Sequence, residues 1–397
     1  MEPVHDVLHD QDLTVTREQE STLYPIVIPG LGVFPPEAGL ISLAASSDGR
    51  FRAGENGVTA VAATKDGKVE FVAFAEHSMP RSSGHSMPRS SGHSMPRSSG
   101  HSLAHVRSAL GYPAYYPIYP VALEKPVRAV LMDLDGTSVR SERFWIWIIQ
   151  LTMASLLANP RFELEDADLP HVSGHSVSEH LEYCIAKYGP GHTVPGTAGH
   201  TMPGTAGHAM PGTAGHAIED ARTLYFEHVR REMAAIVDGH GRADAFAPAP
   251  GLREFLLALK AHGIRIGLVT SGLYEKAFPE ILAAFRSLQL GDPADFYDAI
   301  ITAGFPLRPG EVGTLGELSP KPHPWLYAEA ARVGLGIPFE ARNFVIAIED
   351  SGAGICAIRL AGFPAIGISG GNIVESGTRA LCHAFCDSLA QALEVIL

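Results

Sequence analysis

Two aspartates separated by one residue follow an apolar segment, and their spacing permits two separate roles in one reaction. The segment 127–137 reads VRAVLMDLDGT, so Asp133 and Asp135 close an apolar run that Gly136 interrupts. In an extended chain, alternate side chains point to opposite faces. One carboxylate can therefore attack a substrate while the other works from a different direction. A solvated strand end and a Ca²⁺-type loop are the alternative interpretations.

Two further polar segments have residue types that could bind an anion. Thr270 and Ser271 follow the run IRIGLV, where a hydroxyl and free loop amides form a phosphate cradle, or else a simple helix cap. Lys321 lies in SPKPHP, where the prolines stiffen the backbone and place an ammonium at a helix start. That position disfavours a cation and so indicates an anionic partner, with an ordinary surface lysine as the alternative.

Glu349 and Asp350 are adjacent carboxylates at the end of the apolar run FVIAI. Such a pair is costly at the end of a buried strand unless a cation or hydrogen-bond donors neutralise it. Hard oxygen ligands beside an expected phosphate favour Mg²⁺ as the cofactor. Capping of the following helix by Asp350 is the alternative interpretation.

The elements that must position these residues alternate between short apolar strands and amphipathic helices. Strands are predicted over 127–132, 264–270, 299–303, 344–349 and 365–369. Helices are predicted over 252–262, 275–288, 323–334 and 351–361. This alternation predicts an α/β fold with a doubly wound parallel sheet. Ligands of such sheets bind at the carboxyl ends of the strands, where both aspartates fall.

The chain divides by composition into four predicted parts. They are a small β-rich region over 1–76, a low-complexity and Tyr/Pro-rich linker over 77–126, an α/β core over 127–139 and 250–397, and a helical cap over 140–249. Turn signals such as Asp66-Gly67 between strand-like runs predict a β-meander in the first part. The cap is predicted to hold three helices, near 141–158, 176–188 and 217–238.

Two arrays of eight-residue repeats interrupt this pattern. HSMPRSSG repeats over 77–102, and variants of HTMPGTAG repeat over 192–216 inside the cap. Their Gly, Pro, Ser and Thr content buries too little apolar surface to offset ordering, so duplicated linker is the expected character. The eight repeat histidines suggest metal binding as the alternative, although a flexible chain lacks preorganised ligand geometry.

Charge and cysteine content narrow the class of protein. A formal net charge of −13 argues against nucleic acid or an anionic membrane as the main partner. The four cysteines form no dense framework, the N-terminal MEPVHDVLHDQD has no apolar signal segment, and the apolar run 145–157 is too short to cross a bilayer. The expectation is a cytoplasmic protein with reduced thiols.

Taken together and in order, four motifs resemble those of the haloacid dehalogenase superfamily, in its β-phosphoglucomutase-like branch with a helical cap. The motifs are DLDGT at 133–137, LVTSG at 268–272, KPHPWLY at 321–327 and IEDSGAGICAIRLAG at 348–362. The resemblance covers about 127–375 and implies a Rossmann-like core.

The resemblance also implies a role for each residue. Asp133 would be the nucleophile that forms an aspartyl-phosphate, and Asp135 the general acid and base. Mg²⁺ would be held by Asp133, the Asp135 carbonyl and Asp350, with Glu349 bound directly or through water. Thr270, Ser271 and Lys321 would bind the phosphoryl oxygens. Hydrolytic dehalogenases of the superfamily lack the second aspartate, which disfavours carbon–halogen cleavage.

The expected activity is Mg²⁺-dependent hydrolysis of a phosphomonoester, with a small sugar phosphate or related metabolite as substrate. Segment 174–181 resembles the cap stretch G-x-S-R-x-x-x-L, in which the arginine of mutases holds a second phosphate; here Val177 takes that position and cannot neutralise one. His175 and Ser176 are candidate substrate contacts. The alternatives are a sugar phosphate mutase and a non-catalytic scaffold or metal-binding module.

Overall fold

A computed structural model describes ten stretches of the chain: 26–28, 32–34, 51–54, 57–74, 101–107, 114–171, 177–189, 213–242, 245–303 and 319–397. The chain forms two compact units. One comprises the described parts of Met1–Thr137, Pro250–Leu273 and Ala294–Leu397, and the other those of Ser138–Ala249 and Tyr274–Pro293.

The first unit is built on a six-stranded parallel sheet, as the alternating pattern predicts. Its order is β11-β10-β7-β12-β13-β14. The strands are β7 (Ala129–Asp133), β10 (Arg265–Val269), β11 (Ala299–Ile301), β12 (Val345–Glu349), β13 (Ala365–Ile368) and β14 (Ala384–Cys386). Because β10 and β12 flank β7 on opposite sides, the chain reverses its winding direction between β7 and β12, and a ligand crevice opens at such a point.

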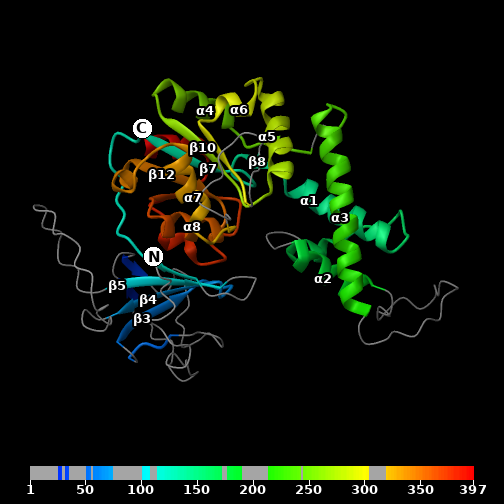
Figure 1. The fold of residues 1–397 in the computed structure, drawn as a ribbon, viewed down its shortest axis with the longest axis horizontal. Coiled ribbons are helices and arrows are strands. Elements are labelled where there is room, and N and C mark those ends of the chain that lie inside the picture. The colour runs from blue at the N-terminus through cyan, green and yellow to red at the C-terminus, as the bar shows by residue number, and fades with distance from the viewer. Residues whose placement is uncertain are drawn as a thin grey trace, which may run out of the picture. The chain divides into compact units, whose positions relative to one another are not determined.

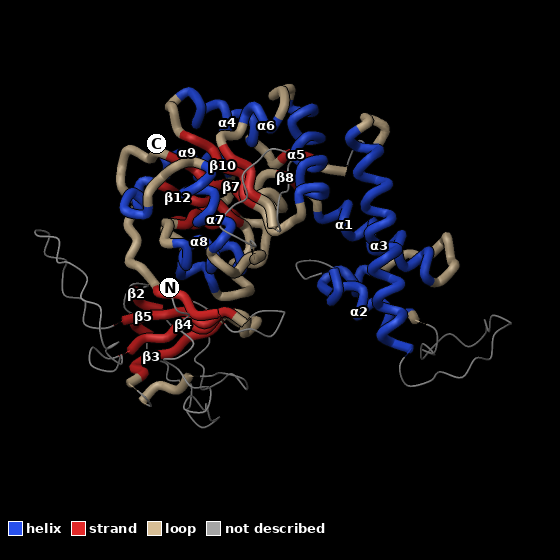
Figure 2. The backbone as a smooth tube through the Cα atoms, viewed as in Figure 1, coloured by secondary structure: helices blue, strands red, loops and turns tan. Residues whose placement is uncertain are grey.

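Helices cover both faces of this sheet (Figures 1 and 2). They are α4 (Leu252–Ala261), α6 (Pro293–Phe296), α7 (Trp325–Glu329), α8 (Gly352–Ala361) and α9 (Leu389–Ile396). α7 continues into a π-helical turn over Ala330–Gly334, within the helix predicted at 323–334. β14 and α9 are additional elements for which the sequence analysis has no counterpart.

The N-terminal part of this unit contains antiparallel strands. β1 (Ile26–Ile28) pairs with β2 (Gly32–Phe34), and a second sheet has the order β3-β4-β5-β6. Its strands are β3 (Val58–Ala63), β4 (Val69–Phe74), β5 (His101–Val106) and β6 (Ala114–Pro117). The predicted Asp66-Gly67 turn joins β3 to β4. The predicted linker over 77–126 needs correction, because β5 pairs in full with β4 and β6 pairs with β5.

This small sheet is not an appendage to the α/β core. One buried apolar cluster includes Phe71 and Ala104 from the small sheet together with Leu326 and Tyr327 of α7. All four side chains are fully buried. Removal of such surface from water is the main force that stabilises packed layers, so the two sheets share one hydrophobic core.

The second unit is helical. It contains α1 (Glu142–Leu156), α2 (Val177–Tyr188), α3 (Thr213–Val237) and α5 (Tyr274–Leu288), with a short ladder between β8 (Val139–Arg140) and β9 (Ala247–Pro248). α3 begins inside the last repeat of the second array. The helix near 275–288 is predicted to lie in the α/β core, whereas the structure groups α5 with α1, α2 and α3. None of the helices in the described stretches has the length and apolar character of a membrane span.

Candidate active site

The strand register brings the predicted carboxylates to one edge of the sheet. Met132 of β7 pairs with Ile348 of β12, so the next residues on the two strands, Asp133 and Glu349, lie level with each other. On the other side of β7, Asp133 pairs with Val269, the residue before Thr270. These three segments therefore converge at the carboxyl ends of parallel strands, where the winding of the sheet reverses.

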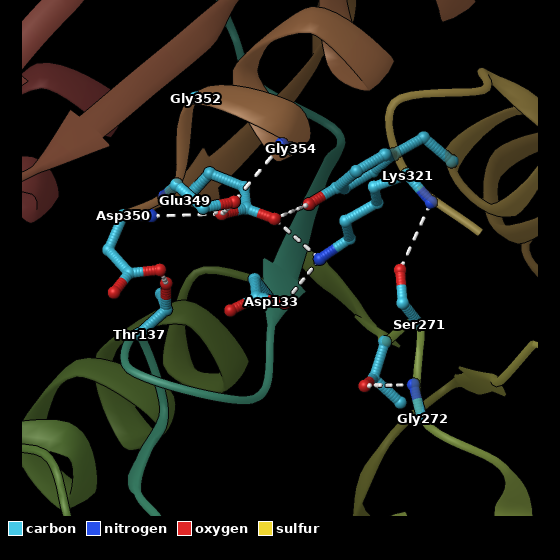
Figure 3. Close-up of polar contacts among 12 residues, drawn as sticks. Asp133, Thr137, Ser271, Gly272, Lys321, Glu349, Asp350, Gly352 and Gly354 are labelled. Atoms are coloured by element: carbon cyan, nitrogen blue, oxygen red, sulfur yellow. Dashed lines mark hydrogen bonds and ion pairs between the residues drawn. The ribbon is translucent and has the colours of Figure 1, made fainter. Parts of the chain in front are cut away.

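Lys321 lies at the centre of this group (Figure 3). Its ammonium donates to a carboxylate oxygen of Asp133 and, at 2.5 Å, to Oε1 of Glu349. The Lys321 side chain is only 8% exposed, and those of Asp133 and Glu349 are 6% and 1% exposed. A surface lysine, the alternative from sequence, is thereby excluded.

Glu349 is saturated with hydrogen bonds, which the sequence analysis did not anticipate. Oε2 accepts from the backbone amides of Asp350 and Ser351, at 3.0 and 2.9 Å, and from the Ser351 hydroxyl at 2.9 Å. Oε1 accepts from the Tyr327 hydroxyl at 3.1 Å as well as from Lys321. These donors stabilise the buried charge and occupy both carboxylate oxygens of Glu349.

Asp350 is held against the loop that follows β7. Thr137, which is buried, lies with its hydroxyl 3.5 Å from Asp350 Oδ1. Gly136 has a φ of +83°, and a Cβ at this position would lie 2.0 Å from Asp350 Oδ2. Only glycine combines the left-handed backbone with such a close approach. The helix cap proposed for Asp350 is instead formed by Ser351, whose hydroxyl accepts from the Gly354 amide at 3.1 Å.

We expect Gly136→Ala to displace Asp350 and to destabilise the protein by about 2–4 kcal/mol, because backbone strain and steric overlap both oppose the new methyl group. Gly263→Ala is the matched control: Gly263 has a φ of +67°, and a Cβ there would meet nothing within 4 Å. Urea unfolding measures both. Equal losses for the two variants would show that the contact with Asp350 adds nothing to the backbone strain.

The site carries more negative than positive charge. Burial and the neighbouring Glu349 raise the pKa of Asp133 well above its ordinary value. The same two causes raise the pKa of Asp350 to about 8. Burial lowers the pKa of Lys321, but the attraction of Asp133 and Glu349 outweighs it and raises that pKa above the ordinary lysine value. Among the described residues, one ammonium therefore faces three clustered carboxylates, and an added cation would favour ionisation of Asp133 and Asp350.

The donor set fits a divalent metal ion. Asp133, Glu349 and Asp350 each offer a carboxylate oxygen, and these oxygens lie within 4.8 Å of one another. Carboxylate oxygens are the ligands preferred by Mg²⁺. Burial and the Glu349 carboxylate raise the pKa of both Asp133 and Asp350, and a divalent ion bound between them would offset this cost of ionisation.

The structure describes three of the five remaining predicted site residues. Thr270 is buried and its hydroxyl accepts from the Gly272 amide at 2.9 Å, while the Ser271 hydroxyl accepts from the Lys321 amide at 3.1 Å. Asp135 is half-buried on the loop after β7. His175 and Ser176 lie outside the described residues.

Sequence reasoning missed Tyr327, Ser351 and Gly371. Tyr327 and Ser351 hold Glu349, and a Cβ on Gly371 would lie 2.2 Å from the carbonyl oxygen of Asp350. Gly370 and Gly371 follow β13 after one residue, Ser369, so a glycine pair after an apolar strand was the available signal for close backbone approach. Tyr327 gave no such signal, because aromatic residues at helical spacing are typical of a core.

A parallel doubly wound sheet that gathers carboxylates and one buried lysine at its winding reversal defines a class of α/β hydrolases. Residues 127–362 match the family of haloacid dehalogenase-like hydrolases. The chain belongs to this family, so the family resemblance seen in the four motifs is confirmed.

Several solved structures are similar to this chain. CbbY from Rhodobacter sphaeroides in complex with phosphate has a TM-score of 0.43 at 22% identity, over 67% of this chain and 96% of that one. A predicted phosphoglycolate phosphatase from Haemophilus somnus has a TM-score of 0.46 at 15% identity, over 69% and 99%. A hydrolase from Pseudomonas syringae has a TM-score of 0.42 at 19% identity, over 68% and 99%. No curated protein matches the sequence.

Proposed function

We propose that the protein is a Mg²⁺-dependent phosphatase that hydrolyses small phosphomonoesters through a phosphorylated aspartate. The observation that carries this proposal is the direct contact of the Lys321 ammonium with Asp133 at the carboxyl end of the central strand. A buried carboxylate beside a fixed cation suits attack on an anionic phosphoryl group, since the cation offsets the repulsion between the two.

Each chain residue has a defined part in this mechanism. Asp133 attacks phosphorus, and the phosphoryl group moves from the substrate oxygen to the Asp133 carboxylate. Asp135 donates a proton to the leaving oxygen and later removes one from the water that releases phosphate. Lys321 and Thr270, with the Ser271 loop, bind the other phosphoryl oxygens. Glu349, held by its five donors, fixes the Lys321 ammonium at the point where charge develops.

The proposed metal ligands are the carboxylates of Asp133 and Asp350 and the carbonyl of Asp135, with Glu349 linked through water because its oxygens already accept other hydrogen bonds. When bound, Mg²⁺ supplies positive charge that reduces repulsion between the nucleophile and the phosphoryl group. The raised pKa values of Asp133 and Asp350 support this requirement, since neither carboxylate ionises readily without added positive charge.

Mg²⁺ binding is expected to release protons near pH 7, because metal-free Asp350 has a pKa of about 8 and must ionise to become a ligand. Titration calorimetry in buffers of different ionisation enthalpy measures this release. Asp350→Asn should abolish the binding and the proton release together. Buffer-independent heats from the unaltered protein would show that Asp350 is already ionised.

The same shift fixes the direction of a stability change with pH. Because the folded pKa of Asp350 lies above the unfolded value of about 3.9, protonation of Asp350 stabilises the metal-free fold. This contribution to the free energy of unfolding is complete below about pH 4 and is lost as pH rises to about 8. Mg²⁺ should therefore raise the melting temperature more at pH 8 than at pH 6.

The proposed reaction is hydrolysis rather than transfer within a sugar phosphate. Val177, the first residue of α2, is apolar where a mutase would need a cation for a second phosphate. A panel of sugar phosphates, phosphoglycolate, nucleotides and an aryl phosphate, assayed with Mg²⁺, tests the proposal. Free inorganic phosphate is the expected product. An isomerised sugar phosphate without free phosphate would favour the mutase, and no turnover on the whole panel would favour a scaffold.

A further inference from the structure

The loop that carries Lys321 has few backbone groups with which to hold its shape. Pro320, Pro322 and Pro324 have no N–H, so only Lys321 and His323 can donate from this stretch. The Lys321 amide donates to the Ser271 hydroxyl at 3.1 Å, and the His323 amide donates to the Pro320 carbonyl at 3.1 Å. The second bond is internal to the loop. The Ala328 amide of α7 donates to the Pro324 carbonyl at 3.0 Å, and side chains supply additional anchors.

One such anchor comes from the N-terminal sheet. The hydroxyl of Tyr116, on β6, lies 2.7 Å from Nδ1 of His323. The Tyr116 ring also packs edge-on against His323, with centroids 5.9 Å apart, and against Trp325, with centroids 6.0 Å apart. His323 is 8% exposed and lies two residues after Lys321. A single tyrosine therefore contacts both the loop and the first residue of α7.

The protonation states suit a direct hydrogen bond. Burial raises the pKa of Tyr116 to about 12, so its hydroxyl keeps its proton. Burial lowers the pKa of His323, so its ring is neutral at pH 7 and Nδ1 can accept. The hydrogen bond therefore joins two neutral groups, and Tyr116 donates when the His323 proton is on Nε2.

Tyr116 is itself fixed by the strand that carries it. It pairs with Ala104 of β5, and Ala104 lies in the cluster that joins the small sheet to α7. β6 lies before residue 127, where the match to the hydrolase family begins. The contact to the lysine loop thus comes from a part of the chain outside the family's own fold.

We propose that Tyr116 is a positioning residue, which holds the loop through His323 so that the Lys321 ammonium stays directed at Asp133. This inference rests on the proposed function. It makes the N-terminal sheet part of the catalytic unit, since one of its strands sets the position of the phosphate-binding lysine.

Tyr116→Phe tests the inference, because it removes the hydroxyl and keeps the ring. The matched control is Tyr115→Phe on the same strand, whose ring stacks on His105 with centroids 5.0 Å apart. With an aryl phosphate and Mg²⁺, Tyr116→Phe should lower kcat about 5- to 10-fold, the effect of one lost hydrogen bond. KM should change less than about 2-fold, and Tyr115→Phe should match the unaltered protein.

Hydrogen exchange of the peptide that spans 319–327 gives a readout that does not depend on turnover. Tyr116→Phe should speed exchange in this peptide, whereas Tyr115→Phe should not. If the unaltered protein shows no phosphatase activity, the proposed function fails while this measurement still tests the contact. Unchanged exchange in Tyr116→Phe overturns the inference whatever happens to kcat.

A double-mutant cycle tests whether Tyr116 acts on the lysine loop through His323. His323→Leu removes the acceptor, so the double variant with Tyr116→Phe should lose no more kcat than His323→Leu alone. Additive losses would mean that Tyr116 acts by another path and would overturn the inference. Thermal unfolding of each variant confirms that the compared proteins are folded. If His323→Leu fails to fold, His323→Asn replaces it, because asparagine retains an acceptor. This variant should keep kcat close to that of the unaltered protein. A loss equal to that of Tyr116→Phe would overturn the inference.

Discussion

Asp133→Asn should lower turnover of any accepted phosphomonoester by ~10³-fold or more, because an amide cannot act as the nucleophile. The substitution keeps the shape of the side chain, so the fold should persist. Its expected effect on stability has the opposite direction to its effect on activity. Burial and Glu349 raise the pKa of Asp133, which means that its ionised form is unfavourable in the metal-free protein, and a neutral amide relieves this cost.

Two measurements check this prediction. Steady-state phosphate release gives the loss of turnover, and acid quenching during turnover of a radiolabelled phosphomonoester should trap label on the unaltered protein but not on the variant. Asp298→Asn is the control, since the Asp298 carboxylate is about one third exposed and pairs with Lys260 at 2.8 Å. Retained turnover in Asp133→Asn would remove Asp133 from the mechanism.

Lys321→Met should impair both stability and catalysis. The change leaves Asp133 and Glu349 buried without their shared cation, and loss of one partner from a buried ion pair costs about 3–5 kcal/mol. Turnover should fall by ~10²-fold or more, because in the proposed mechanism the ammonium also stabilises charge on the transferred phosphoryl group. Added Mg²⁺ should restore part of the stability and little of the turnover, since a metal ion offsets the carboxylates but leaves the phosphoryl oxygens without their lysine.

Lys260→Met is the matched control for this variant. Lys260 pairs with Asp298 at 2.8 Å with both side chains about one third exposed, and such pairs contribute about 1 kcal/mol or less. Chemical denaturation in the absence of metal compares the two variants. Equal losses in the free energy of unfolding would show that the buried Lys321 ion pairs contribute no more than an exposed pair. The carboxylate cluster would then be neutralised by other groups.

The sequence predicted the α/β core closely because its signals are local. Apolar runs with polar ends mark β7, β10, β11, β12 and β13, and each observed strand lies within or one residue beyond its predicted range. The helices α4, α7 and α8 begin within two residues of their predicted starts. Periodicity within a segment decides such elements, and no knowledge of the partner strand is needed.

The errors lie where pairing with a distant segment decides the structure. Residues 101–106 end a low-complexity array in sequence, yet they form β5 because β4 offers a complete antiparallel partner. Tyr116 lies in a stretch predicted as linker, and its role follows from β6 and from a contact with His323. α5 carries a helical pattern that says nothing about which unit it joins.

For the site, the sequence by itself determined which residue types stand at the ends of apolar strands and in what order. Tertiary structure alone decided that Asp133 and Glu349 share one lysine and that Oε2 of Glu349 accepts from the turn at Ser351. It also decided that Tyr116 forms a hydrogen bond with His323 in the lysine loop. The physical reason is that strand patterns are set by neighbouring residues along the chain. Hydrogen bonds, burial and the resulting pKa values depend on strand order and register, which bring together atoms that lie up to about 200 residues apart in sequence.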